Sequence, residues 1–172
     1  TTPTVLDLCT GSGCVAIALA KNCPTATITA RDVSPGAIAI ATENAAKHHV
    51  TERVTFCTGD LFAAMPAESA FDVIVSNPPY IPSAEIATLH ADVQQYEPRL
   101  ALDGGTDGLD LIRRILAEAK RPLKPGGWLM FEFTPEQAPA ILTLAHDHGY
   151  SDATIVKDTA NQPRFLRARY LS

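Results

Sequence analysis

Short apolar runs, several of them rich in β-branched residues, alternate along the chain with segments of helical periodicity. Runs of this length predict buried strands, and a period of about 3.6 residues predicts helices. The predicted strands are residues 5–8, 25–30, 54–57, 71–76, 128–133, 153–156 and 165–170. The predicted helices are residues 15–20, 35–48, 109–119 and 135–148. This alternation is typical of a doubly wound, Rossmann-like α/β sheet, and the last two strands predict a β-hairpin.

A glycine-rich loop, Cys9-Thr10-Gly11-Ser12-Gly13, follows the first predicted strand. Glycines permit positive φ and let a ligand approach the backbone closely. The free N–H groups at the start of the next helix favour a carboxylate or a phosphate. The spacing of Gly11, Gly13 and Ala16 also matches the dinucleotide pattern G-x-G-x-x-G/A. The loop therefore predicts a nucleotide-type cofactor without selecting one.

Two acidic residues stand at the ends of the second and third predicted strands. Asp32 lies about twenty residues beyond the glycines, where a carboxylate typically binds ribose hydroxyls. Asp60 follows a glycine at the same edge of the sheet, where it could accept a hydrogen bond from an adenine amino group while Leu61 packs on the base. A simple turn role for Asp60 fits the same pattern.

The fourth predicted strand ends in Asn77-Pro78-Pro79-Tyr80. Two prolines end the strand and remove two N–H donors, so the chain leaves the sheet in extended form. The carbonyls of Asn77 and Pro78, the Asn77 side chain and the Tyr80 ring then suit a planar –NH2 group whose two hydrogens must both be held. A strand end followed by a Pro-Pro turn is the alternative.

Composition narrows the function further. The length of 172 residues and the hydrophobic fraction of 46% predict one globular domain, and no apolar stretch is long enough to span a membrane. The net charge of −5 argues against a large nucleic-acid footprint. The four cysteines lack C-x-x-C spacing, so we expect reduced, mostly buried thiols in a cytoplasmic protein, and no metal site. The abrupt opening into a strand suggests that a segment upstream of Thr1 has been removed.

The connection at residues 81–108 is too long for a simple loop and contains Glu97-Pro98-Arg99 and Asp103-Gly104-Gly105. Connections of this length in a compact domain tend to be functional.

Together these motifs resemble the class I S-adenosylmethionine-dependent methyltransferases. The stretch from Asp7 to Gly13 looks like their first cofactor motif, Asp32 matches their ribose-binding acid, and Asn77-Pro78-Pro79-Tyr80 matches their motif for methylating a planar nitrogen. The stretch from Glu97 to Gly105, with Asp107-Gly108-Leu109, is similar to the HemK/PrmC branch. That branch methylates the side-chain amide nitrogen of the glutamine in the Gly-Gly-Gln motif of class 1 peptide-chain release factors.

The resemblance implies a fold, a cofactor and a set of site residues. The fold is a seven-stranded, mostly parallel sheet whose last strand is antiparallel, formed by residues 1–172 as a single catalytic domain. The family's N-terminal helical domain, which helps to bind the release factor, is absent from this sequence. The methyl donor is S-adenosyl-L-methionine and the product is S-adenosyl-L-homocysteine. The implied catalytic residues are Asn77, Pro78, Pro79 and Tyr80. The implied cofactor contacts are Asp7, Cys9, Thr10, Gly11, Ser12, Gly13, Asp32, Val33, Asp60, Leu61 and Asn77.

Two stretches depart from the family pattern: Glu132-Phe133-Thr134, where Glu-Ile-Gly is usual, and residues 158–164, which lack a glycine before the arginine. Three other functions remain open. An adenine amino group of DNA or RNA fits the same clamp, a ribosomal-protein glutamine is a related substrate, and a nicotinamide-dependent oxidoreductase fits the glycines and Asp32 but leaves Asn77-Pro78-Pro79-Tyr80 unexplained. A non-enzymatic binding module would need no such cluster.

Overall fold

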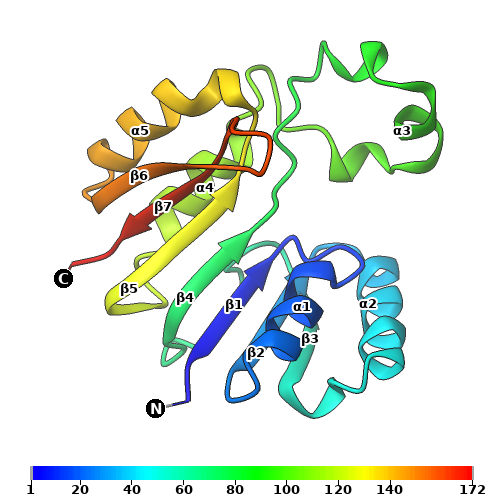
Figure 1. The fold of residues 1–172 in the computed structure, drawn as a ribbon, viewed down its shortest axis with the longest axis vertical. Coiled ribbons are helices and arrows are strands. Elements are labelled where there is room, and N and C mark those ends of the chain that lie inside the picture. Colours follow the sequence, from blue (N-terminus) through cyan, green and yellow to red (C-terminus); the bar gives the residue numbers. More distant parts are fainter. Residues whose placement is uncertain (1, 172) are drawn as a thin grey trace.

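The computed structural model describes residues 2–171 and contains one seven-stranded sheet in the order β3-β2-β1-β4-β5-β7-β6 (Figure 1). Strand β7 pairs antiparallel with β5 and β6, and the other pairs are parallel. The doubly wound sheet and the closing hairpin are therefore confirmed. The strands are β1 (Thr4–Leu8), β2 (Thr27–Asp32), β3 (Val54–Thr58), β4 (Phe71–Ser76), β5 (Leu123–Glu132), β6 (Ser151–Lys157) and β7 (Pro163–Arg169).

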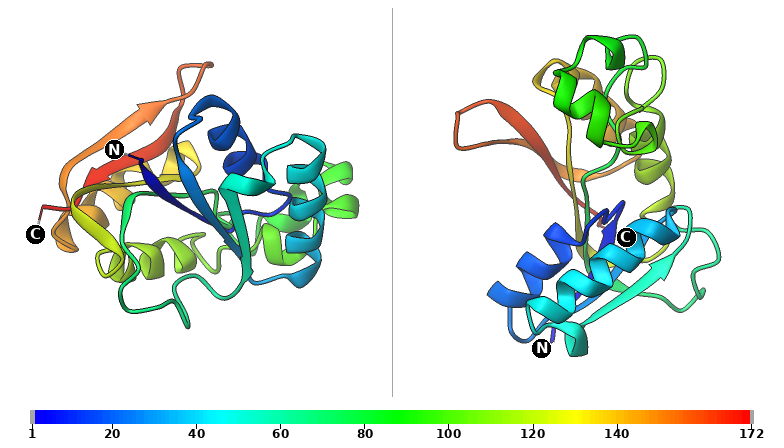
Figure 2. Two further views of the ribbon diagram at one scale, coloured as in Figure 1. Left: turned by 90° about the horizontal axis from the view of Figure 1, so that it is seen from below. Right: turned by 90° about the vertical axis from the view of Figure 1, so that its right-hand side faces the viewer.

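Successive strand residues point to opposite faces of the sheet. Helices cover both faces because apolar strand residues lie on each of them. On β1, Val5 belongs to a core cluster with residues of α1 and α2, whereas Leu6 and Leu8 belong to a second cluster with residues of α4 and α5. Figure 2 shows α1 and α2 lying side by side on one face. The helices are α1 (Cys14–Asn22), α2 (Pro35–Lys47), α3 (Ala91–Tyr96), α4 (Asp110–Glu118) and α5 (Ala138–Asp147).

Local signals fix several helix ends. Ser34 Oγ accepts from the Ala37 N–H at 3.3 Å, with Pro35 in the first helical position of α2. Gly149 has φ of 72° and donates its N–H to the His146 carbonyl at 2.8 Å, which closes α5. The predicted helix over residues 135–148 starts as the 3₁₀ turn η4 (Pro135–Gln137) before α5 begins.

Several predicted strand boundaries are wrong by two or more residues, including the starts of β2, β5, β6 and β7. Strand β2 begins at Thr27 because the Ala26 N–H donates back to Cys23 in a turn. Strand β5 begins at Leu123, since Leu123 already pairs with Phe71, and residues 124–127 form an irregularity before Trp128 pairs with Val73. There Gly126 adopts φ of 79° and donates its N–H to the Tyr170 carbonyl at 2.7 Å.

Residues 81–108, called the lobe below, project from the strand ends of the sheet (Figure 1, upper right). Besides α3, the lobe contains the 3₁₀ turns η2 (Ile86–Thr88) and η3 (Arg99–Ala101). The long connection is therefore a folded element.

The expectation of mostly buried thiols is wrong. Cys14 and Cys23 are exposed because they lie at the two ends of α1. Cys9 and Cys57 are half-buried, since they lie near the carboxyl ends of β1 and β3. In residues 2–171 no helix is long and apolar enough to cross a membrane, and no group of three or more His, Cys, Asp or Glu side chains is arranged to hold a metal ion.

One carboxylate ties three strands together at the edge opposite the lobe. Asp72 Oδ2 accepts from the Thr4 N–H at 2.7 Å, the Thr4 hydroxyl at 2.9 Å and the Lys124 ammonium at 2.8 Å. The Lys124 and Thr4 hydrogen bonds lower the pKa of Asp72 to about 2.

Asp72→Asn should lower the free energy of unfolding at pH 7 by about 1 kcal/mol or less, since the group is partly exposed and screened. Because the folded pKa lies below the ordinary 3.8, this contribution is complete above about pH 4 and is lost as the pH falls toward 2. Denaturant unfolding at pH 7 and pH 2.5 measures it, with exposed Asp92→Asn as the control for removing one charge. A wild-type-to-variant difference that is equal at both pH values would contradict this account.

Candidate functional site

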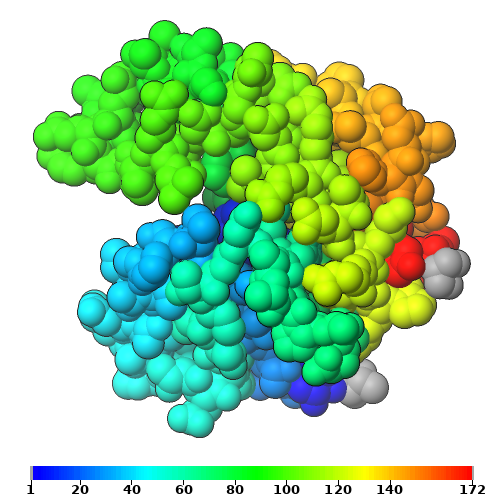
Figure 3. Space-filling model, turned by 180° about the vertical axis from the view of Figure 1, so that it is seen from behind, coloured from blue at the N-terminus to red at the C-terminus, as the bar shows by residue number. Residues whose placement is uncertain are grey.

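A cavity of about 630 Å³ lies between the carboxyl ends of the strands and the lobe. Figure 3 shows the corresponding hollow between the green lobe and the blue and cyan segments. Nine residues predicted from the sequence line it: Cys9, Gly11, Ser12, Asp32, Val33, Asp60, Leu61, Asn77 and Pro79. The carboxyl edge of a doubly wound sheet is where such folds bind ligands.

The backbone of the glycine loop lines the cavity and is accessible to a ligand at Gly11. Gly11 has φ of +54°, and a Cβ built on it would meet no heavy atom within 4 Å. Gly13 has φ of +85°, and its Cβ would come within 3.1 Å of the Ala41 side chain and 3.2 Å of Ile17. The first glycine therefore leaves room for a ligand, and the second permits close packing of α1 against α2.

The Asp32 carboxylate is held in place by the backbone on both sides. Its Oδ2 accepts from the Gly11 N–H and its Oδ1 from the Ser34 N–H, each at 2.9 Å. Each carboxylate oxygen has further lone-pair capacity. The side chain is thus oriented at the cavity wall and can still accept hydrogen bonds from a ligand.

Asp7 and Thr10 lie behind the loop, and neither is a lining residue of the cavity. Asp7 Oδ2 accepts from the Thr10 hydroxyl at 2.6 Å and from the Ala16 N–H at 3.2 Å. Burial raises the pKa of the Asp7 carboxyl to about 7 despite these two bonds. Asp7 braces the loop against the start of α1, and the cofactor contacts predicted for Asp7, Thr10 and Gly13 stay predictions.

Asp60 and Leu61 form a further wall of the cavity. The exposed Asp60 carboxylate pairs with the Arg114 guanidinium of α4 at 2.9 Å. Leu61 is buried with φ of 44°. The turn is supported from below by buried Arg31, which donates to the Ala63 carbonyl at 2.7 Å. A Cβ on Gly59 would collide with the Arg31 guanidinium, so any larger residue here would displace that side chain.

The segment after β4 brings polar atoms to the opposite side of the cavity. Asn77 is exposed and lines the cavity together with Pro79. The Tyr80 hydroxyl donates to Glu132 Oε1 at 2.8 Å, and burial together with Glu132 raises the pKa of Tyr80 to about 12. Pro78 and Tyr80 are not lining residues, and the catalytic roles of all four residues from Asn77 to Tyr80 stay predictions.

Sequence reasoning missed two groups of lining residues. One group comes from the turn after Asp32 and the start of α2, and the other comes from the lobe. They are Ser34, Gly36, Ala37 and Ile40, and Tyr96, Glu97, Pro98, Leu100, Ala101 and Asp103. Gly59 and Leu111 also line the cavity without having been predicted. The signals for the second group were the length of the 81–108 connection and its stretch from Glu97 to Gly105.

The strand order is that of a class I methyltransferase fold, and the cavity lies at the carboxyl ends of its neighbouring strands β1 and β4. A methyltransferase from Pyrococcus furiosus superposes with a TM-score of 0.76 at 22% identity, covering 99% of this chain and 76% of that chain. A ribosomal protein L11 methylase from Lactobacillus delbrueckii subsp. bulgaricus gives 0.69 at 21% identity, covering 100% and 72%. At these identities the likeness shows the fold alone.

The family model described as methyltransferase small domain matches residues 1–104, and the chain belongs to this family. A release factor glutamine methyltransferase from Geobacter sulfurreducens is 46% identical, over 96% of this chain and 57% of its own length. A second, from Gloeobacter violaceus, is 44% identical over 94% and 57%. A ribosomal protein uL3 glutamine methyltransferase from Bradyrhizobium diazoefficiens is 48% identical over 74% and 40%. The chain therefore spans little more than half the length of the release-factor relatives.

Asp7→Asn should raise stability at neutral pH, because the amide oxygen can accept both bonds now made by Oδ2 without a buried charge. Since the folded pKa of Asp7 lies above the ordinary 3.8, the wild type loses stability as the pH rises from about 4 to 7, whereas the variant does not. We expect the variant to be more stable by at least about 1 kcal/mol at pH 8. Denaturant unfolding between pH 4 and pH 8 tests this, and a constant difference between the two proteins would refute it.

Proposed function

We propose that this chain transfers a methyl group from S-adenosylmethionine to the side-chain amide nitrogen of the glutamine in the Gly-Gly-Gln motif of class 1 release factors. The observation that carries the proposal is the placement of Asn77, the polar residue after β4, in the same cavity as Asp32 and Gly11. The identities to release factor glutamine methyltransferases support this choice of substrate.

The cavity fits the proposed cofactor in size and chemistry. Its volume of about 630 Å³ is within the range of small-molecule sites. Asp32 would accept hydrogen bonds from the ribose hydroxyls, and Gly11 leaves backbone room beside it. Val33 and Leu61 offer apolar surface to the adenine, and Asp60 can accept from its amino group.

The remaining task of the protein is to hold an amide nitrogen. When bound, S-adenosylmethionine supplies a methyl group activated by its attachment to a positively charged sulfur. The amide lone pair is delocalised into its carbonyl, so nucleophilic attack depends on orientation. The Asn77 side-chain oxygen and the Pro78 carbonyl would accept the two N–H bonds and direct the nitrogen toward the cavity. The methylated nitrogen is acidic and loses its proton to solvent, so no histidine or lysine base is needed.

A second candidate substrate is a glutamine of a ribosomal protein. The uL3 glutamine methyltransferase, which is 48% identical to this chain over 128 aligned residues, favours this candidate. The chemistry and the clamp are the same for both substrates, so only the acceptor protein differs. An adenine amino group is the third acceptor, and the net charge of −5 weighs against it.

Incubation with a labelled methyl donor and each acceptor separates these functions. We expect label on a class 1 release factor and none when its Gly-Gly-Gln glutamine is replaced by glutamate. Uptake by ribosomal protein uL3 alone would favour the second candidate. Uptake by adenine-containing oligonucleotides but not by either protein would overturn the proposal.

Asp32→Ala should weaken binding of S-adenosylhomocysteine by about 1.5–3 kcal/mol, the typical worth of hydrogen bonds to a charged group. Calorimetry measures the loss, with NAD titrated in parallel to test the oxidoreductase alternative. Unchanged affinity with a lowered melting temperature would make Asp32 a purely structural residue.

Asn77→Ala should lower the single-turnover methylation rate by roughly a hundredfold or more at saturating cofactor, because an oriented polar group is lost from the transition state. Affinity for S-adenosylhomocysteine should stay nearly intact. The matched control is Asn22→Ala, at the end of α1 away from the cavity. Near-normal turnover by the Asn77 variant would place the amide clamp elsewhere.

A further inference from the structure

The lobe leaves the body of the protein and returns to it through a narrow base. The Ile81 N–H donates to the Leu102 carbonyl at 3.0 Å, and the Gly104 N–H donates to the Ile81 carbonyl at 2.9 Å. The Ser83 N–H donates to the Gly105 carbonyl at 2.9 Å. These bonds form a short parallel ladder that holds the two ends of the lobe to each other.

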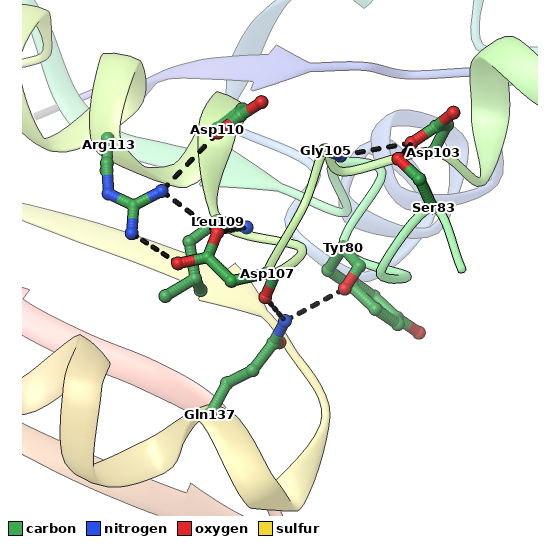
Figure 4. Close-up of polar contacts among 9 residues, drawn as sticks. All are labelled: Tyr80, Ser83, Asp103, Gly105, Asp107, Leu109, Asp110, Arg113 and Gln137. Carbon is green, nitrogen blue, oxygen red and sulfur yellow. Dashed lines mark hydrogen bonds and ion pairs between the residues drawn. The ribbon is translucent and has the colours of Figure 1, made fainter. Parts of the chain in front are cut away.

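One buried side chain outside the lobe bonds to both of these ends. Gln137, the last residue of η4, is 8% exposed. Its Nε2 donates to the Tyr80 carbonyl at 2.9 Å and to the Asp107 carbonyl at 3.2 Å (Figure 4). Its Oε1 accepts from the Thr134 N–H at 3.0 Å. Tyr80 directly precedes the lobe and Asp107 lies at its end, so a single carboxamide fixes both to the start of α5.

The residue after Asp107 is shaped around this carboxamide. Gly108 has φ of +75°, and a Cβ placed on it would collide with the Tyr80 carbonyl oxygen and with Gln137 Nε2. Glycine is therefore required at this position for two reasons: it permits the positive φ, and it allows three chain segments to approach one another closely.

Asp107 is also held from the side of α4. Its carboxylate accepts from the Leu109 N–H at 3.1 Å and from the Arg113 guanidinium at 2.5 Å (Figure 4). The Asp107 carbonyl is thus presented to Gln137 by a backbone that is itself fixed to α4.

We propose that Gln137 is a positioning residue that sets where the lobe stands over the cavity, and with it the backbone of Asn77-Pro78-Pro79-Tyr80. Tyr96, Leu100 and Asp103 of the lobe line the cavity opposite the glycine loop, and the Tyr80 carbonyl held by Gln137 is three residues from Asn77. Loss of the two donated bonds frees the lobe and the acceptor side of the site together. The catalytic part of this inference rests on the proposed function.

The test replaces the carboxamide by a carboxylate of the same shape. Gln137→Glu keeps an acceptor for the Thr134 N–H and, when ionised, loses both donors. We expect kcat for methyl transfer to fall at least tenfold, while the dissociation constant of S-adenosylhomocysteine changes less than threefold. The matched control is the exposed neighbour, Glu136→Gln, which carries the reverse exchange and should behave as the wild type.

Amide hydrogen exchange tests the position of the lobe directly and does not depend on methyl transfer. In Gln137→Glu the amides of Ile81, Ser83 and Gly104 should exchange at least tenfold faster, while those of β1 and β4 stay unchanged. If the wild type methylates no acceptor, the proposed function fails and hydrogen exchange still decides the role of Gln137. Unchanged lobe amides, or a uniform rise across the sheet with kcat intact, would overturn the inference.

Gly108→Ala provides a second variant that disturbs the same contact from the other side. It should lower kcat and speed lobe exchange as Gln137→Glu does, and the double variant should be little worse than either single one because both remove one interaction. Additive effects of the two substitutions would show that they act separately and would contradict the clamp.

Discussion

The parallel pairing of β1 with β4 is the constraint on which the site depends. The chain places Leu8 beside Ser76, and the Ser76 hydroxyl donates to the Leu8 carbonyl at 2.9 Å. The connection after β1 passes over one face of the sheet and the chain beyond β4 packs its helices on the other, so the two connections diverge and leave a crevice at the strand ends. The glycine loop and the Asn77 segment both start at this crevice. Their proximity follows from topology and requires no contact between them.

Backbone hydrogen bonds then fix the orientation of the polar groups around the crevice. Asp32 is held by two N–H groups, Asp7 fixes the loop from behind, and Glu132 holds the Tyr80 ring by its hydroxyl. A site positioned in this way loses little free energy in ordering its side chains when a ligand binds, which is the advantage of preorganisation. The lobe supplies the remaining wall and is fixed to the body by Gln137.

Much of this arrangement could be predicted from the sequence because it is written in local signals. The strand ends, the glycine loop, Asp32 and Asn77 each follow an apolar run, and parallel strands bring such positions to one edge. Three contacts could not be predicted, because each joins residues more than fifty positions apart. They are the hydrogen bonds of Arg114 with Asp60, of Glu132 with the Tyr80 hydroxyl and of Gln137 with the Tyr80 carbonyl. The early start of β5 could not be predicted because Pro125 and Gly126 are residues typical of turns, whereas the pairing of Leu123 and Trp128 with β4 includes them in an irregular strand.

The most direct test of the account is a crystal structure with S-adenosylhomocysteine and a peptide containing the Gly-Gly-Gln motif. The account predicts the ribose hydroxyls within hydrogen-bonding distance of the Asp32 carboxylate. It also predicts the glutamine amide nitrogen within hydrogen-bonding distance of Asn77 Oδ1 and the Pro78 carbonyl, beneath the lobe. A cofactor bound away from Asp32, or a glutamine amide held by neither Asn77 nor Pro78, would contradict it.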